Sequence, residues 1–169
     1  MDNPTVRMIV DTPKDSRIKY KLEESSGGYI VDRILVPGLC FPFNFGFVPK
    51  TKAADGDPVD MILVCNASLP VGCAVDCAIL GVIEAEQTEG GETYRNDRVI
   101  AISLKDGDAP QSLDQLPKDF VENVERFFST YHQAEGNEFK VLQLNDAEEA
   151  LGLIERAALT QNGRKSHRS

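Results

Sequence analysis

The sequence is poor in basic side chains. Its 169 residues include 18 lysines and arginines against 27 aspartates and glutamates, so the formal charge is −9. A chain that binds nucleic acid needs a basic face, and this balance argues against such a partner. No apolar run approaches the length of a membrane span, and the start, Met1-Asp2-Asn3-Pro4, lacks the basic and apolar segments of a signal peptide. We expect a cytoplasmic protein without a membrane segment.

Cysteine is scarce as well. Cys73 and Cys77 have no second Cys or His pair nearby, which argues against a zinc site. Cys40 and Cys65 lie in apolar stretches and are typical of buried small hydrophobic residues. Four cysteines without a metal-binding pattern, in a sequence without a targeting segment, fit the reducing cytoplasm.

The densest feature is Ala54-Asp55-Gly56-Asp57-Pro58-Val59-Asp60, where three carboxylates fall within six residues. Carboxylates this close repel one another unless cations lie between them, and oxygen ligands suit Mg²⁺, Mn²⁺ or Ca²⁺. An EF-hand loop opened at Asp55 needs Gly at its sixth position and Glu at its twelfth, but these are Asp60 and Asn66. Asp, Gly and Pro are also ordinary turn residues, so a solvated acidic turn stays open beside a metal site.

Hydrophobic periodicity predicts strands first and helices last. Strands are expected at 6–10, 18–22, 29–33, 61–64, 74–82, 98–102 and 139–144. One helix follows Pro117 and ends before Gly136, and a second starts at the cap Asn145-Asp146 and carries an apolar face to Ala157. The order favours an α+β fold with a curved or closed antiparallel sheet. Residues 1–160 then form a single domain, and 161–169 a flexible basic tail.

Two segments fit neither pattern. Residues 35–52 mix prolines and glycines with Phe41, Phe43, Phe45 and Phe47. We expect a core-covering loop with aromatic anchors, and the alternative is the wall of a pocket beside the acidic segment. Residues 84–95 are polar and glycine-rich and are predicted to form a hairpin loop.

Four stretches resemble the soluble (type I) inorganic pyrophosphatases. Residues 55–60 match the family signature D-G-D-P-x-D, and residues 11–20 (DTPKDSRIKY) are similar to its E-I-P-K-G-S-R-N-K-Y segment. Residues 31–33 with 41–49 resemble its DR…YPxNYGFIP segment, and 127–131 (FFSTY) its FFxxY helix. The resemblance spans roughly residues 5 to 158. It implies a small closed antiparallel β-barrel of the OB type flanked by two helices, and a homo-oligomer.

The resemblance also implies the chemistry, which is hydrolysis of inorganic pyrophosphate to two phosphates by a water molecule that Mg²⁺ or Mn²⁺ activates. Carried over by position, the metal ligands are Asp55 and Asp60, to which the resemblance adds Asp11, where the family has Glu, and Asp97, the carboxylate next to Asn96. Asp57 is the catalytic carboxylate nearest the attacking water. The phosphate-binding side chains are Lys19, Arg33, Arg98 and Tyr131.

Several positions depart from the family pattern, namely Lys21, Phe41, Phe45, Asn96 and His132, where the family has Glu, Tyr, Tyr, Asp and Lys. The family's outer acidic pair falls on Gln87 or Thr88, with Glu89 beside it. Two alternative functions therefore stay open: a hydrolase of an organic phosphoanhydride, with Phe41, Phe43 and Phe45 meeting the organic group, and a silent relative that binds metal or phosphate. Simpler interpretations also remain. His132 fits a solvated helix end, Tyr131 fits core packing, and Asp97 with Arg98 fits an exposed pair at a strand start.

Overall fold

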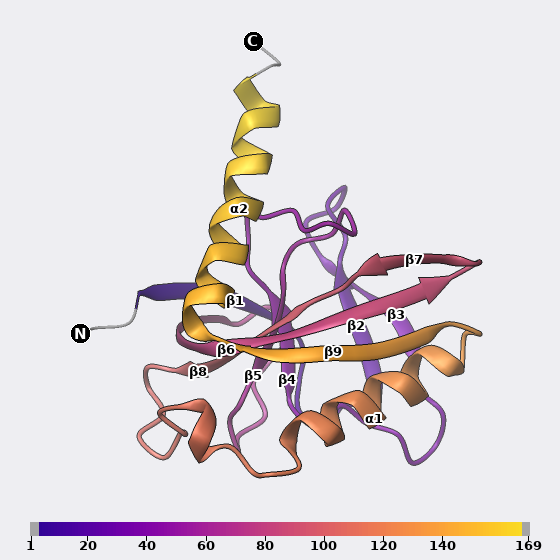
Figure 1. Cartoon of the computed structure of the whole chain (residues 1–169). Helices are drawn as coiled ribbons and strands as arrows, with labels where there is room; N and C mark the ends of the chain where they lie inside the picture. Colours follow the sequence, from indigo (N-terminus) through magenta and orange to yellow (C-terminus); the bar gives the residue numbers. More distant parts are fainter. Residues whose placement is uncertain (1–3, 167–169) are drawn as a thin grey trace.

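The computed structural model describes residues 4–166, with side chains as far as residue 158. In chain order the elements are β1 (Thr5–Thr12), β2 (Ile18–Leu22), β3 (Tyr29–Ile34), β4 (Asn44–Phe47), β5 (Asp60–Leu63), β6 (Ala74–Glu89), β7 (Glu92–Arg95), β8 (Arg98–Ser103), the 3₁₀ helix η1 (Leu113–Gln115), α1 (Phe120–Gln133), β9 (Glu138–Asp146) and α2 (Ala147–Ser166) (Figure 1). The predicted α+β class is confirmed.

Five strands close into a ring. They are hydrogen-bonded in the order β1-β4-β5-β8-β6, and β6 pairs again with β1. The β5–β8 pair is parallel, whereas the sequence predicted antiparallel pairing throughout. The reason is geometric, because strand directions cannot alternate all the way around a ring with an odd number of members. β7 and β9 pair with the long strand β6, and β2 and β3 form a separate hairpin.

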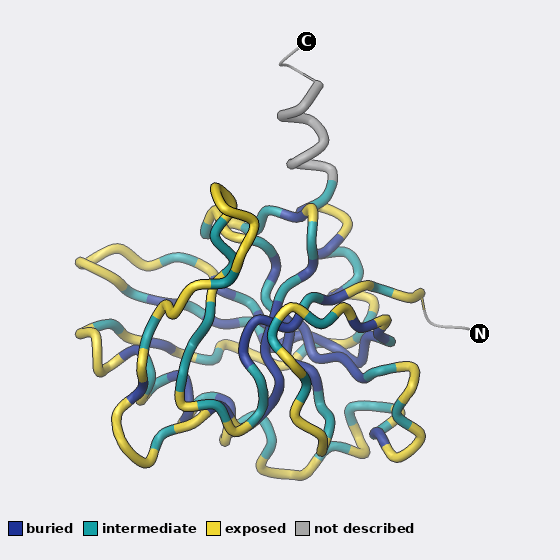
Figure 2. The backbone as a smooth tube through the Cα atoms, turned by 180° about the vertical axis from the view of Figure 1, so that it is seen from behind, coloured by how far each residue is buried: buried dark blue, intermediate teal, exposed yellow. Residues whose placement is uncertain are grey.

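Two hydrophobic clusters form the core, and the alternation of side chains along each strand separates them. The first joins the ring to α2, with Met8 and Val10 of β1, Met61 and Leu63 of β5, Val99 and Ala101 of β8, and Ala150, Ile154 and Ala157 of α2 among its members. The second joins the ring to α1, with Phe41, Phe43, Phe45, Ile62, Ile83, Ala85, Ile100, Phe127, Phe128 and Phe139 among them. Figure 2 shows the buried residues concentrated where these strands cross.

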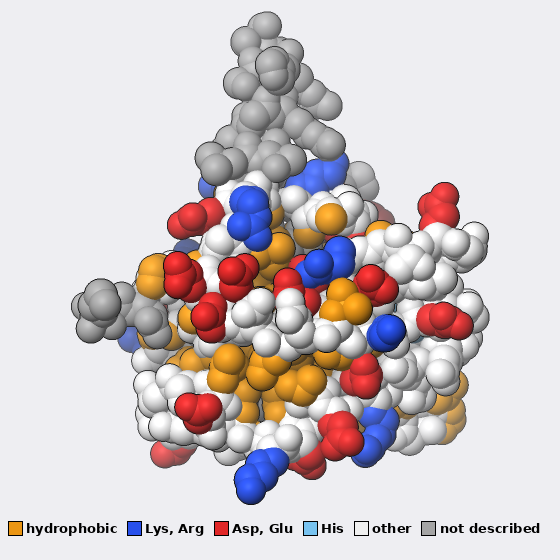
Figure 3. All heavy atoms as spheres, in the orientation of Figure 1, with side chains coloured by type: hydrophobic (Ala, Val, Ile, Leu, Met, Phe, Trp, Pro, Cys, Tyr) orange, Lys and Arg blue, Asp and Glu red, His pale blue; other side chains and the backbone are white. Residues whose placement is uncertain are grey.

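The two helices take the places that their patterns predict. The α1 stripe is confirmed, since Val124, Phe127 and Phe128 are buried, and α1 lies along β9 (Figure 1). The Asp146 carboxylate accepts a hydrogen bond from the Glu149 N–H at 3.0 Å and caps α2. No helix in the described part of the chain is long and apolar enough to cross a membrane. On the face shown in Figure 3, hydrophobic side chains gather over the region of β9 and α1.

Four expectations need revision here. Cys40 is exposed and Cys65 is only partly buried, so neither is the buried residue that the sequence predicted. Residues 35–52 contain the short strand β4, which the interruptions by Pro and Gly had hidden. The predicted hairpin loop 84–95 consists mostly of strand, since β6 continues to Glu89 and turns into β7. The expected tail 161–169 lies partly in α2, whose backbone continues to Ser166, and its last three residues lie outside the described residues.

Candidate active site

The acidic segment is an ordered turn between β4 and β5. Asp55 Oδ1 accepts a hydrogen bond from the Asp57 N–H at 3.0 Å, and Gly56 takes a φ of 90°, which favours glycine. The Val59 N–H donates to the buried Thr51 hydroxyl at 3.0 Å, so the end of the turn is fixed to the core. Asp57 is exposed, Asp55 is partly buried, and burial raises the pKa of Asp55.

Asp60 opens β5 and lies beside Arg98 in the parallel register. Because Ile62 and Ile100 belong to the α1-side cluster, strand alternation places Asp60 and Arg98 on that same face. Burial raises the pKa of Asp60 to about 7; the positive charges of Arg98 and Lys19 oppose the rise, and the negative charges of Asp55 and Asp11 add to it. The structure therefore brings the acidic turn, the end of β1 and the starts of β5 and β8 to one place.

Asp11 ends up in a buried ion pair. Its Oδ1 lies 3.2 Å from the Lys19 ammonium and accepts a hydrogen bond from the Thr12 hydroxyl at 2.8 Å. Thr12 in turn accepts from the Tyr20 N–H at 3.2 Å, which ties β1 to β2. Burial raises the pKa of Asp11, against the effect of Lys19 and Thr12.

Arg98 is not an exposed residue at a strand start, because only 3% of it is accessible. Its guanidinium lies 4.0 Å from the Phe128 ring centre and 4.7 Å from that of Phe139, and it donates to the Asn96 carbonyl at 2.7 Å. Its Nε is buried and has no hydrogen-bond partner among the described residues. Burial lowers the pKa of Arg98, and Asp60 is the largest opposing influence.

A second cationic group faces α1 from the β2–β3 hairpin. Lys19 and Arg33 are register partners, and the Arg33 guanidinium lies 4.0 Å above the Tyr131 ring and 3.5 Å from Glu135. Burial raises the pKa of Tyr131 to about 12. Tyr131 thus lies at the edge of the aromatic cluster, with the Arg33 guanidinium on the face of its ring. This position is compatible both with a role in core packing and with a role in phosphate binding.

His132 is buried, so the expected solvated helix end is wrong. It is 6% exposed and stacks on Phe139 at 5.7 Å and on Phe128 at 6.2 Å. Burial lowers its pKa to about 3, and the positive charges of Arg98 and Arg33 act in the same direction. It is therefore a neutral imidazole at neutral pH.

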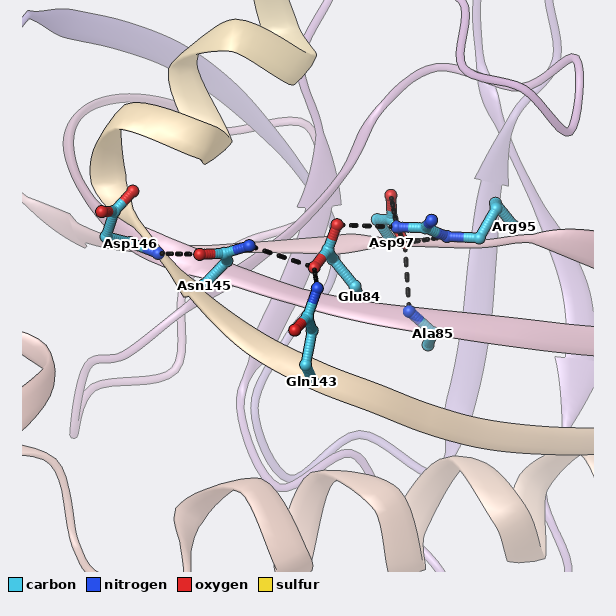
Figure 4. A network of polar contacts seen from close by, with 7 residues as sticks. All are labelled: Glu84, Ala85, Arg95, Asp97, Gln143, Asn145 and Asp146. Carbon is cyan, nitrogen blue, oxygen red and sulfur yellow. Dashed lines mark hydrogen bonds and ion pairs between the residues drawn. The ribbon is translucent and has the colours of Figure 1, made fainter.

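Asp97 lies apart from the other carboxylates that the sequence assigned to metal. Its Oδ1 accepts from the Ala85 N–H at 3.0 Å and from Arg95 Nε at 3.1 Å, and its Oδ2 from Arg95 at 3.0 Å. Glu84 accepts from the same guanidinium at 2.9 Å (Figure 4). Strand alternation places Asp97 with Val99 and Ala101, on the face that packs toward α2.

The three phenylalanines beside the site form part of the core. Phe41, Phe43 and Phe45 are 0%, 5% and 4% exposed, and their rings pack on Phe127 and Phe128. The core-anchor interpretation is therefore confirmed. Rings this buried offer no surface to an organic substituent of a substrate.

The family model for inorganic pyrophosphatase matches residues 8–161. The chain belongs to the inorganic pyrophosphatase family. The enzyme so named from Helicobacter pylori is 31% identical over 167 residues, covering 96% of this chain and 94% of the relative, and that from Aquifex pyrophilus is 34% identical over 134 residues, covering 77% and 73%. A solved Helicobacter pylori pyrophosphatase has a TM-score of 0.85 at 30% identity, with 95% of each chain covered.

Membership in this family of hydrolases implies a divalent metal cofactor. The donors present fit a hard cation, since Asp11, Asp55, Asp57 and Asp60 offer only carboxylate oxygens. Among the described side chains no group of three or more His, Cys, Asp or Glu residues is arranged to hold a metal ion by itself. In a Mg²⁺-type site one or two carboxylates bind the ion, and water and substrate phosphates complete its shell.

Sequence reasoning missed several partners of the site residues in this pyrophosphatase. Thr12, which donates to Asp11, lies in the matched segment 11–20 but was given no role there, and Glu135, which contacts Arg33, lies outside the matched motifs. The Glu84–Arg95–Asp97 network also escaped notice, because its members come from strands whose pairing the sequence did not predict.

Proposed function

We propose that this chain hydrolyses inorganic pyrophosphate to two phosphates with Mg²⁺, or Mn²⁺ in its place, as cofactor. The observation that supports it most is the convergence of Asp60 with Asp55, Asp11, Lys19 and Arg98. Clustered carboxylates suit a divalent ion, and the adjacent cations suit a phosphate that carries negative charge. The buried phenylalanines give no support to an organic phosphoanhydride.

Each side chain in the proposed site has a role. Asp11, Asp55 and Asp60 would supply oxygens to divalent ions, with no more than two of these carboxylates on any one ion, and the metal would lower the pKa of a bound water molecule. Asp57, exposed at the turn, would take the proton from the attacking water. Asp97 is left out of the metal set because both its oxygens already accept hydrogen bonds.

The cations divide into two kinds. Lys19 and Arg33 are 13% exposed in their side chains and would contact phosphate oxygens. Tyr131, which lies under Arg33, would add a hydroxyl donor. Arg98 is enclosed by Phe128 and Phe139, and we assign it chiefly a positive charge that favours the ionised form of Asp60 beside it.

We also propose a homo-oligomer in the cytoplasm. Val31 and Ile34 on β3 are 56% and 63% exposed, and Leu142 and Leu144 on β9 are each 41% exposed, which supports burial against other copies. The four free cysteines support a reducing compartment. Light scattering on the purified chain tests the first proposal, and a single-chain mass would refute it.

The decisive experiment measures phosphate release from pyrophosphate with Mg²⁺ for the wild type and Asp57→Asn. We expect release that a chelator abolishes and that falls about 10²-fold or more in the variant, the usual effect of losing a general base. Asp108→Asn, an exposed loop aspartate, is the matched control and should keep wild-type rates. A wild type that releases no phosphate at saturating Mg²⁺ would overturn the proposal.

A further inference from the structure

Amide side chains, not carboxylates, occupy the β6–β8 side of the site. Gln87 and Asn96 are 6% and 9% exposed, and Asn96 Nδ2 donates to Gln87 Oε1 at 2.5 Å. Gln87 Nε2 then donates to Glu89 Oε1 at 2.7 Å, and Asn137 donates to the same oxygen at 3.2 Å. The buried amide pair and Glu89 therefore already satisfy one another.

This amide pair belongs to the site face of the sheet. Arg98 donates to the Asn96 carbonyl, and Gln87 shares the strand face of Ile83 and Ala85, which belong to the α1-side cluster. Arg98 is in turn the register partner of Asp60, the last residue of the acidic segment. The pair and the acidic turn thus flank the same space.

Glu89, the carboxylate that contacts the pair, already accepts hydrogen bonds, and so do the two carboxylates on the opposite face of these strands, Asp97 and Glu84. Both oxygens of Asp97 accept from Arg95, and both oxygens of Glu84 accept from Arg95 or from Gln143 and Asn145 (Figure 4). A divalent ion would have to displace a guanidinium from this network. A protonated guanidinium and a metal ion compete for the same oxygens, so this network does not supply ligands.

The acidic end of the site differs in this respect. Within the described residues no hydrogen bond or ion pair reaches the carboxylate oxygens of Asp57 or Asp60, and Asp55 accepts one bond, from the Asp57 N–H. These oxygens are free to bind a cation without losing a protein partner. A neutral amide carbonyl brings no charge to offset that of the ion, so the two ends of the site are unequal toward a divalent metal.

We propose that this pyrophosphatase holds divalent metal only at the acidic end, through Asp11, Asp55 and Asp60, and that the Gln87–Asn96 pair keeps the β6–β8 side free of metal. The inference rests on the proposed function for the metal at the acidic end. What it adds is that no metal binds at the β6–β8 side. It means fewer bound ions than a site with carboxylates on both sides would hold.

The test counts bound metal without turnover. Mn²⁺ is titrated into the full chain, and the free ion is measured by electron paramagnetic resonance, for the wild type, Asp55→Asn/Asp60→Asn and Gln87→Glu/Asn96→Asp. We expect the first variant to lose all tight Mn²⁺ and the second to bind about one more ion than the wild type. Asn66→Asp/Gln133→Glu is the matched control, because it adds the same charge at two exposed positions.

The outcomes separate the two proposals. Tight Mn²⁺ that persists in Asp55→Asn/Asp60→Asn would overturn the inference and the assignment of these two ligands, and would leave the proposed hydrolysis of pyrophosphate standing. A Gln87→Glu/Asn96→Asp chain that binds no more Mn²⁺ than the surface control would also overturn it, provided its circular dichroism is that of the wild type. No Mn²⁺ binding by the wild type would refute both.

Discussion

His132 should make the folded chain sensitive to acid. Its pKa is about 3 in the fold and 6.5 in a model peptide, so the unfolded chain takes up a proton below pH 6.5 while the folded chain does not. Stability is thus unaffected by this group above pH 6.5 and falls as the pH drops from about 6.5 toward 3. The groups facing the imidazole are Arg98 on β8, Arg33 on β3, Phe139 on β9 and its neighbour Tyr131.

The size of the effect follows from the shift. One pH unit corresponds to about 1.4 kcal/mol, so lowering the pH from 7.5 to 4.5 costs roughly 3 kcal/mol through His132 alone. His132→Phe keeps an aromatic ring against Phe139 and Phe128 but cannot titrate. Its loss of unfolding free energy over that pH interval should be smaller than the wild-type loss by about that amount.

Urea unfolding at both pH values, without phosphate and with a chelator present, measures the difference. His132→Gln is the companion variant, because it keeps a polar side chain that does not titrate. Both variants should show the same reduced dependence on pH even if their absolute stabilities differ. If His132→Phe lost as much stability as the wild type between pH 7.5 and 4.5, the buried neutral imidazole would be refuted.

The other predictions concern the stability of the strands and the helix around the site. Gly46→Ala places a methyl group 2.0 Å from the Ile9 carbonyl oxygen and should cost about 3 kcal/mol in urea unfolding; Gly28→Ala, where the nearest atom is at 3.8 Å, should be neutral. Asp146→Ala removes the α2 cap and should cost about 1 kcal/mol by the same assay. Arg95→Met removes the ion pairs with Glu84 and Asp97 and should lower the unfolding free energy by only about 1 kcal/mol, because ion pairs of an exposed residue are weak. High salt should reduce this difference.

Local sequence patterns predicted much of the fold. The α1 stripe and the Asp146 cap follow from residues close in sequence, so periodicity and capping rules were enough to find them. Strand β4 could not be found this way, because its four residues, Asn44–Phe47, pair with β1 and β5 and carry no pattern of their own. The closure between β1 and β6 is likewise a long-range contact.

The burial of charged groups could not be predicted from the sequence either. Lys19 and Arg33 were placed by resemblance, and the hairpin register supports their pairing. Nothing local indicated that Arg98 and His132 would be enclosed by Phe128 and Phe139, because the rings come from α1 and β9. Tertiary packing thus turned two apparently exposed polar residues into buried ones.

Asp97 shows why a carboxylate one residue away does not replace a missing one. In a strand the side chains alternate between faces, so Asn96 and Arg98 share the face of the site while Asp97 points the other way. There it binds Arg95, and together with Glu84 it fixes the start of β8 against β6. A carboxylate at position 96 would face the site, whereas the carboxylate at position 97 faces α2. Asn96→Asp and Asp97→Asn should therefore act on different properties, the first on metal binding and the second on stability.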